Sequence, residues 1–171
     1  MRDHLGYRLE LREEPDVSDA ERAAVGELLF AAWQEEKALG RGWHNHEPLF
    51  RAFAWHGSDL AAARMTCLVE NEAGLRLFGF GDMTVAAAHR GHGLARALTA
   101  WLVEEAVARG AELLLVSTYE MASVYLGLGF RLCAPSEFHL VCPDGRESRS
   151  DHLYARWLVE PLPELVYHSY F

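Results

Sequence analysis

The sequence predicts an α+β fold (mixed α/β), in which helices flank a mixed, mostly antiparallel central sheet. Three patterns support this prediction: short segments of alternating apolar residues between turn residues, two longer segments with apolar residues at helical spacing, and one continuous apolar run typical of a covered strand. The chain has 171 residues, close to the size at which one hydrophobic core is expected. We therefore expect a single domain over residues 1–171.

The N-terminal third is expected to form a strand, a helix and a loop. Apolar residues alternate with charged ones over residues 7–11 and predict a strand that ends before Pro15. Ser18 stands three residues before Glu21, which predicts a capping box at the start of an amphipathic helix. Glycine and proline over residues 39–48 predict a loop, followed by a short helix.

A meander of three strands is predicted next, at residues 52–56, 60–70 and 75–85, with turn residues between them. The third strand contains Gly79 and Gly81. Glycine in a strand interior is costly unless a bulge or a close ligand approach requires it. An irregular backbone is therefore expected in this strand.

The C-terminal half alternates helices and strands. Residues 93–109 carry apolar residues at helical spacing and predict a helix, which leads to a covered strand at 112–117. A short helix is expected at 121–128. The last predicted elements are strands near 130–141 and 152–159, joined as a final hairpin by a turn at 143–145.

Charge and cysteine content exclude several classes of partner. Sixteen lysines and arginines against 25 acidic residues give a formal charge of −9, the wrong sign for binding nucleic acid or an anionic membrane. The same charge favours cationic ligands. Cys67, Cys133 and Cys142 form no zinc-binding spacing, and the charged N-terminus lacks the apolar core of a signal peptide. We therefore expect a cytoplasmic protein with no metal and no nucleic-acid or membrane partner.

The most informative segment lies between a predicted strand and a predicted helix and reads HRGHGLA over residues 89–95. Successive backbone N–H groups at such a turn point into one concavity, and the helix dipole adds positive potential. The segment therefore predicts a diphosphate site, and its glycines permit the close approach. Arg96 stands where a dinucleotide fingerprint has its third glycine, and the Gly-Lys-Ser/Thr of a P-loop is absent, so neither of those motifs fits.

Two motifs resemble the GNAT superfamily of N-acetyltransferases. Arg90, Gly93 and Ala95 match its Arg/Gln-x-x-Gly-x-Gly/Ala signature, and in that family this loop binds the pyrophosphate of acetyl-CoA. Residues 124–130, VYLGLGF, look like the second signature of the family, a Tyr-x-x-x-Gly-Phe at the end of the helix after the central strand. Two motifs in the right order make the resemblance specific.

The resemblance implies the GNAT acyl-CoA N-acyltransferase fold over residues 5–158, with 159–171 as a C-terminal extension, and acetyl-CoA (coenzyme A) as co-substrate. Tyr119 departs from the family, because many members carry asparagine near that position. The residues expected to contact the cofactor are Met83, Val85, Arg90, Gly91, His92, Gly93, Leu94, Ala95 and Tyr125.

The chemistry of the thioester suggests roles for three of the residues. Backbone N–H groups around Met83 are expected to polarise the thioester oxygen as an oxyanion hole. Tyr125, which matches the acid of the family, is expected to donate a hydrogen bond and then a proton to the leaving thiolate. Asp82 is the candidate catalytic base for the protonated acceptor amine, with Glu120 and His56 as alternatives. Each of these residues also has a purely structural interpretation, as packing or as an ordinary polar side chain.

The acceptor is the least explicit part of the sequence. Residues 53–57, FAWHG, the late Asp151 and residues 163–166, PELV, resemble aminoglycoside 2′-N-acetyltransferases in arrangement. The expected substrate is a small cationic amine, an aminoglycoside-like antibiotic or a polyamine, which would imply antibiotic resistance in the first case. The expected substrate-binding carboxylates form an acidic mouth of Glu35, Glu36, Asp82 and Asp151.

Two alternatives to this function stay open: a protein or peptide N-acetyltransferase, and a regulatory GNAT module that binds CoA without turnover. The run His44-Asn45-His46 invites a metal interpretation. Two histidines in a loop without a nearby cysteine or paired carboxylate are more typical of a solvated loop, which can contribute to the acceptor pocket. A homodimer through the final strands is also expected.

Overall fold

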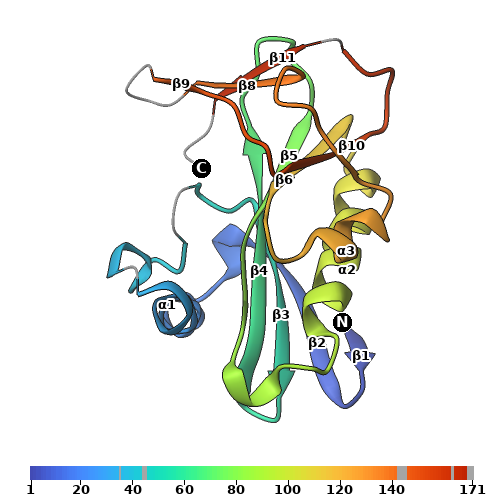
Figure 1. Cartoon of the computed structure of the whole chain (residues 1–171). Helices are drawn as coiled ribbons and strands as arrows, with labels where there is room; N and C mark the ends of the chain where they lie inside the picture. The colour runs from blue at the N-terminus through green and yellow to red at the C-terminus, as the bar shows by residue number, and fades with distance from the viewer. Residues whose placement is uncertain (35, 44–45, 142–145, 163, 169–171) are drawn as a thin grey trace. The chain divides into compact units, whose positions relative to one another are not determined.

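The computed structural model describes residues 1–34, 36–43, 46–141, 146–162 and 164–168 (Figure 1). Two compact units make up the chain. The first consists of Met1–Cys67 and Gly81–Leu102, and the second of Leu68–Phe80 and Val103–Phe171. Three elements contribute residues to both units: strands β4 (Asp59–Val69) and β5 (Leu77–Val85) and helix α2 (Leu94–Ala108).

In the first unit, an antiparallel sheet runs in the order β1, β2, β3, β4. Its longer strands confirm the predictions for residues 7–11, 52–56 and 60–70. The sequence does not predict β1, because its three polar residues are too few to show an apolar alternation. The bounds are Arg2–His4 for β1, Tyr7–Glu13 for β2 and Phe50–His56 for β3.

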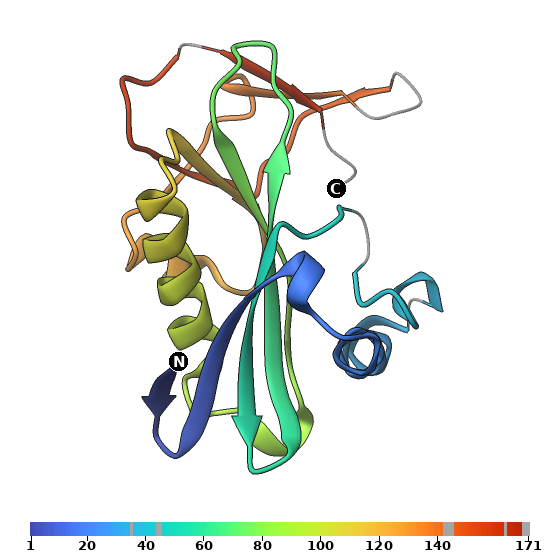
Figure 2. The same ribbon diagram turned by 180° about the vertical axis from the view of Figure 1, so that it is seen from behind.

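Helix α1 (Asp19–Trp33) begins with the predicted capping box. The Ser18 hydroxyl accepts a hydrogen bond from the Glu21 N–H, and the Glu21 carboxylate accepts one from the Ser18 N–H at 2.9 Å. The buried Leu29 of α1 packs in one apolar cluster with Phe53 of β3. Helix α1 lies on one side of the strands, and the first turns of α2 lie on the other (Figures 1 and 2).

The prediction of a short helix after Pro48 is wrong, because the chain enters β3 directly. The Leu49 N–H donates to the Thr66 carbonyl at 2.7 Å, and the strand begins at Phe50. The apolar run that starts there belongs to the sheet. The described residues of this unit also form the short 3₁₀ helices η1 (Glu14–Asp16), η2 (Glu36–Ala38) and η3 (Ala87–His89).

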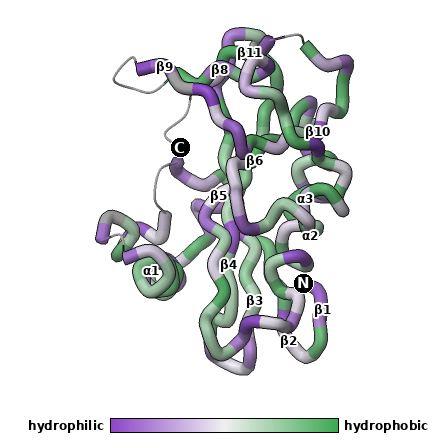
Figure 3. Tube along the Cα trace, in the orientation of Figure 1, coloured by the Kyte–Doolittle hydropathy of each residue, from purple (hydrophilic) through white to green (hydrophobic). Residues whose placement is uncertain are grey.

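Two buried arginines interrupt β3 and β4, which are otherwise mostly hydrophobic (Figure 3). Arg51 of β3 is 1% exposed and Arg64 of β4 is 2% exposed. The Arg64 Nη1 donates to the Thr99 hydroxyl of α2 at 2.6 Å. Because a buried charge is costly without compensation, each guanidinium depends on its partners.

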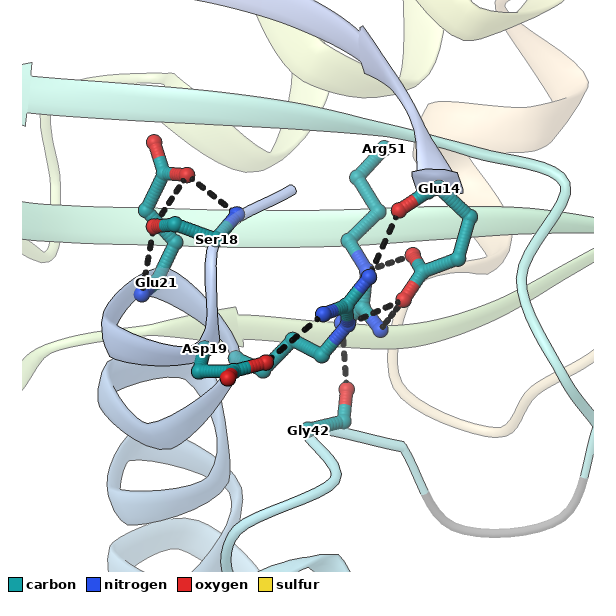
Figure 4. Close-up of polar contacts among 7 residues, drawn as sticks. Glu14, Ser18, Asp19, Glu21, Gly42 and Arg51 are labelled. Carbon is teal, nitrogen blue, oxygen red and sulfur yellow. Dashed lines mark hydrogen bonds and ion pairs between the residues drawn. The ribbon is translucent and has the colours of Figure 1, made fainter. Parts of the chain in front are cut away.

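Glu14, Arg22 and Arg51 form an ion cluster, which we call the buried ion cluster (Figure 4). Arg51 donates from Nε and Nη2 to the two oxygens of the Glu14 carboxylate at 2.5 and 3.0 Å, and from Nη1 to the carbonyl of Gly42. Arg22 of α1 donates to the same carboxylate at 2.9 Å. The cluster therefore ties the end of β2, helix α1, the loop at residues 39–49 and β3 together.

In the second unit, the strands of the larger sheet are mixed in direction. β6 pairs parallel with the start of β5 and antiparallel with β10, and β10 pairs antiparallel with β7. Leu113, Leu114 and Leu115 are fully buried, as expected for a covered strand. A smaller sheet pairs β8 parallel with β11 and antiparallel with β9. The bounds are β6 Leu113–Ser117, β7 Arg131–Leu132, β8 Phe138–Val141, β9 Glu147–Ser148, β10 Leu153–Trp157 and β11 Leu165–His168.

One prediction for the C-terminal part is wrong, and another is confirmed only in part. The strand expected at 130–141 is broken, because the Glu137 carboxylate accepts hydrogen bonds from the Arg131 guanidinium and, at 2.6 Å, from the Ala134 N–H, which turns the chain between β7 and β8. The final hairpin forms only in part, because β7 pairs antiparallel with β10 whereas β8 belongs to the smaller sheet. The turn predicted at 143–145 lies outside the described residues.

Other expectations are confirmed with changed limits. The helix predicted at 93–109 is α2, and Gly110 follows it with a φ of 79°. Helix α3 (Ala122–Leu126) is shorter than predicted, and the extension at 159–171 contributes strand β11. No helix in the described part of the chain is long and apolar enough to span a membrane. The single domain stays a prediction.

The buried ion cluster makes a prediction about stability. Glu14→Ala leaves the Arg51 guanidinium buried without its carboxylate, so we expect a loss of about 3–5 kcal/mol in the free energy of unfolding, measured by urea denaturation. Asp19→Ala is the matched control, because Asp19 also pairs with Arg22 but is fully exposed, and it should lose only a small fraction of that amount. Equal losses in the two variants would contradict this account.

Candidate functional site

Strand β5 contains the irregular backbone that its glycines predict. Asp82 has a φ of 47°, in the left-handed region that residues other than glycine rarely adopt. A Cβ on Gly81 would meet only the flexible end of the Met65 side chain, so the unusual conformation of Asp82 is the main irregularity. A residue in this conformation interrupts the regular alternation of a strand, so it changes the direction of the residues that follow, here Met83 to Val85.

A glycine-containing turn connects β5 to α2. After η3 the chain passes through Gly91 and Gly93, which have φ values of 81° and 72°. The Gly93 carbonyl accepts the first hydrogen bond of α2, from the Ala97 N–H at 3.0 Å. The N–H groups of the first helical turn have no acceptor within the helix, and such groups are suited to binding an anion. The diphosphate site expected at this turn stays a prediction.

The backbone of the turn is accessible. A Cβ on Gly91 would meet nothing within 4 Å, so open space lies in front of this backbone. Leu94 is buried, so the atom that it offers to a ligand is its N–H rather than its side chain. The other expected cofactor residues of this unit are exposed at Arg90, Gly91, His92 and Gly93 and half-buried at Met83, Val85 and Ala95.

Two residues that the sequence interpretation missed contact this turn. The Nε2 of His4 donates to the His92 carbonyl at 2.9 Å. The hydroxyl of Tyr7 lies 3.1 Å from the Nδ1 of His89. These pairs are 88 and 82 positions apart in the chain, so no local pattern could reveal them. The unpredicted strand β1 brings His4 to the turn.

The loop at residues 39–49 borders a cavity of about 470 Å³ in the first unit. The Gly42 carbonyl is held by Arg51, and the Trp43 carbonyl accepts from Arg41 Nε at 2.7 Å. Glu14 and Glu47 also line this cavity. The loop therefore has a defined conformation at its base, as expected of a segment that contributes to a binding pocket.

His46 of the same loop interacts electrostatically with Asp82. Burial lowers the pKa of His46 below the usual histidine value, and the negative charge of Asp82 opposes this shift only in part. The ring is therefore neutral at neutral pH. His44 and Asn45, the other members of the run considered as a metal site, lie outside the described residues. Within the described ranges no three His, Cys, Asp or Glu side chains form a group that could hold a metal ion.

In the second unit, Tyr125 lies on α3 and is 1% exposed. Its ring packs edge-on against Phe130 at 5.2 Å between centroids and parallel to Tyr154 at 6.4 Å. The carbonyl of Tyr125 accepts hydrogen bonds from the N–H groups of Leu128 and Phe130, which closes the turn after the helix. The motif thus holds the phenol in a fixed place, and its catalytic role stays a prediction.

The same unit has a cavity of about 280 Å³ beside the end of β6 and the start of β10. The rings of Tyr119 and His152 stack at 3.7 Å between centroids on its edge. The Asp151 carboxylate accepts a hydrogen bond from the Nδ1 of His152 at 2.9 Å, and this hydrogen bond lowers the pKa of Asp151. Ser117 and Arg149 also line the cavity, which therefore combines a π surface with charges of both signs.

The predicted acidic mouth contains four carboxylates. Glu35 lies outside the described residues, and Glu36 is exposed on η2. Asp82 is half-buried on β5, and Asp151 is exposed at the smaller cavity. Their convergence on one acceptor stays a prediction. Glu120 and His56, the alternative bases, are both exposed.

Comparison with known proteins identifies the family. The sequence profile of the acetyltransferase (GNAT) family matches residues 7–130. The chain belongs to this family. It is therefore an acetyltransferase by family, and the resemblance read from its two motifs is confirmed. Among curated proteins no sequence matches the chain.

Solved GNAT structures share the fold and confirm the predicted fold class. A GNAT family N-acetyltransferase of Escherichia coli (YhbS), determined in complex with CoA, has a TM-score of 0.65 at 15% identity, covering 99% of this chain and 93% of that one. A GNAT acetyltransferase of Brucella melitensis, in complex with acetyl-CoA, has a TM-score of 0.65 at 15% identity, with 96% of each chain covered. The ribosomal-protein-S18-alanine N-acetyltransferase of Escherichia coli has a TM-score of 0.56 at 18% identity, covering 90% and 96%.

The electrostatic interaction between His46 and Asp82 predicts a pH effect with a definite sign. An NMR titration of the His46 ring should give a pKa below the usual histidine value. Asp82→Asn removes the charge that favours the imidazolium, so this variant should lower the pKa of His46 further. An unchanged or higher pKa in the variant would show that the two side chains do not interact.

Proposed function

We propose that this protein is an acetyl-CoA-dependent N-acetyltransferase that transfers an acetyl group directly to a primary amine of a small cationic molecule, such as an aminoglycoside-like antibiotic or a polyamine. The observation that carries the proposal is the turn before α2, where two left-handed glycines and the N–H groups of the first helical turn form an open anion site in a GNAT chain.

In this proposal the turn from Arg90 to Ala95 binds the diphosphate of acetyl-CoA mainly through backbone N–H groups. Backbone groups suit this role in a chain with a formal charge of −9, because they attract phosphate without an array of lysines and arginines. The re-aimed backbone around Met83 donates a hydrogen bond to the thioester oxygen as it gains negative charge.

The reaction needs no enzyme nucleophile. The neutral amine of the acceptor attacks the thioester carbonyl, a C–N bond forms and the C–S bond breaks. The acylated nitrogen then loses a proton, which balances the proton that the leaving thiolate takes up. Asp82 takes the proton that the acceptor ammonium must lose before attack. The left-handed conformation of Asp82 supports this assignment, because backbone strain of this kind clusters at functional sites.

Tyr125 is proposed as the acid for the leaving thiolate. A phenol has a reference pKa of about 10 and a thiol of about 8.5, so complete proton transfer begins roughly 2 kcal/mol uphill. A hydrogen bond from the phenol still stabilises the thiolate before the proton moves. The rigid packing of Tyr125 against Phe130 and Tyr154 supports this role, because it orients the hydroxyl.

For the acceptor, the smaller cavity supplies features that suit a cation. The exposed Tyr119 ring offers a π face, and Asp151 offers a carboxylate that stays ionised because His152 lowers its pKa. The positive charge of Arg149 at the same cavity is offset by Glu164, 3.3 Å away. The excess of carboxylates in the chain adds long-range attraction.

A cytoplasmic location and a homodimer complete the proposal. The thiols of Cys67 and Cys133 are free and buried, which is typical of proteins from a reducing compartment. Burial raises the pKa of Cys133 to about 11, so this thiol is protonated and unreactive at neutral pH.

Gly93→Val tests the cofactor site. A branched side chain is strained at a φ of 72°, and its Cβ would lie 3.4 Å from the Nε2 of His4, so the turn must change shape. We expect the affinity for CoA, measured by calorimetry, to fall by at least about tenfold. Gly74→Val is the matched control, with a φ of 67° and nothing within 4 Å. If Gly93→Val binds CoA as tightly as the parent, the proposed diphosphate site is misplaced.

Tyr125→Phe tests the acid. The change keeps the ring and its packing and deletes only the hydroxyl, so kcat should fall on the order of 10²–10⁴-fold while the dissociation constant of CoA changes little. Steady-state kinetics and calorimetry measure the two effects. With chemistry rate-limiting, a decrease in kcat below about threefold would leave Tyr125 as a packing residue.

A further inference from the structure

Four imidazole rings and one phenol ring form a layer beside the proposed diphosphate turn. His4 of β1 stands directly opposite Tyr7 of β2 in the strand register. The Tyr7 ring lies 5.3 Å from the ring of His56 at the end of β3. These three side chains form a row across three neighbouring strands. Together with His89 and His92 we call them the histidine layer.

His89 and His92 join the layer from the turn. The Tyr7 ring centroid is 5.6 Å from each of their rings, and His56 is 5.4 Å from His89. The Nδ1 of His92 donates to the His89 carbonyl at 3.2 Å. Because His4 also donates to the His92 carbonyl, the layer and the turn form one structure.

Charged groups of both signs lie on the elements that carry the layer. Arg90 lies on the turn, Arg96 is exposed on the first turn of α2, and the guanidinium of Arg2 lies 4.6 Å from the Trp101 ring. Asp59 stands opposite His56 in the register and brings a carboxylate to this end of the sheet. Asp3 and Arg8, opposite each other one position from His4 and Tyr7, alternate to the other face of the sheet, where Arg8 pairs with Glu10 at 3.0 Å.

We propose that the histidine layer binds a phosphate monoester, the 3′-phosphate of the CoA whose diphosphate occupies the turn. This inference rests on the proposed function. The ribose that links the two groups keeps the monoester within one sugar of the diphosphate. A phosphate monoester has a second pKa of about 6 and is a dianion at neutral pH, so it accepts strong charge-assisted hydrogen bonds from imidazolium groups.

The hydrogen bonds within the layer leave suitable donors. They engage the Nε2 of His4 and the Nδ1 atoms of His89 and His92. The donors proposed for the phosphate are therefore the Nε2 atoms of His89 and His92 and the ring of His56.

The competing interpretation is that the layer only supports the turn. His56 separates the two roles, because it contacts the rings of Tyr7 and His89, whereas His4 and His92 supply the hydrogen bonds to the turn backbone. Loss of support for the turn lowers the affinity for every ligand that has a diphosphate. Loss of a phosphate site lowers the affinity only for a ligand that has the 3′-phosphate.

The test is calorimetry with CoA and with dephospho-CoA, which lacks only the 3′-phosphate. At neutral pH the parent protein should bind CoA on the order of tenfold more tightly than dephospho-CoA. His56→Gln should lower the affinity for CoA severalfold and leave that for dephospho-CoA unchanged. His139→Gln is the matched control, because His139 pairs with Glu147 on the smaller sheet, and it should change neither affinity.

Three results would overturn the proposal. Equal affinity of the parent for both ligands would remove the phosphate site and leave the acetyl-CoA function intact. An equal loss for both ligands in His56→Gln would assign the layer to support of the turn. Absence of binding by either ligand would remove the proposal together with the function on which it rests.

Discussion

The left-handed backbone of Asp82 is the constraint on which the candidate site of the first unit depends. A residue other than glycine pays about 1–2 kcal/mol for this conformation, and aspartate tolerates it better than most. The backbone changes conformation at Asp82, just before Met83, and the Ala86 N–H donates a hydrogen bond to the Ala61 carbonyl at 2.8 Å beyond the end of the strand. The turn and the N-terminus of α2 follow directly. One strained position thus sets both the proposed oxyanion donor and the proposed diphosphate site.

A second constraint holds the loop beside this strand. Arg51 is almost fully buried in β3, and its charge is tolerated because Glu14 accepts two hydrogen bonds from it and Gly42 accepts a third. Burying such a cluster stabilises a protein little compared with an apolar core, but breaking it is costly. Its effect is therefore specificity of conformation: the base of the loop that carries His46 is fixed against the sheet. Asp82 and His46 interact because both the strand and the loop are held.

The sequence predicts the elements whose signals are local. The capping box of Ser18 and Glu21, the glycines of the turn at residues 89–95 and the apolar run of β6 each depend on neighbours in the chain, and each is confirmed. The missed features depend on distant partners. β1 is recognisable only through its pairing with β2, and the break between β7 and β8 arises from the Glu137 carboxylate. His4 and Tyr7 reach the turn across more than eighty positions, so the histidine layer has no signature in the sequence.

The central claim is acetyl transfer to a cationic amine, and an assay of thiol release from acetyl-CoA tests it most directly. The rate would be measured with an aminoglycoside, a polyamine and a neutral amine at low and high salt, with mass spectrometry of the products. The account predicts N-acetylated product in amounts equal to the thiol released. It also predicts that kcat/KM for the cationic acceptors falls as salt rises, because attraction between exposed charges is screened over about 8 Å at physiological ionic strength. Binding of CoA without any amine-dependent thiol release would contradict the account and identify a regulatory module, and equal salt dependence for all three amines would contradict the cationic acceptor.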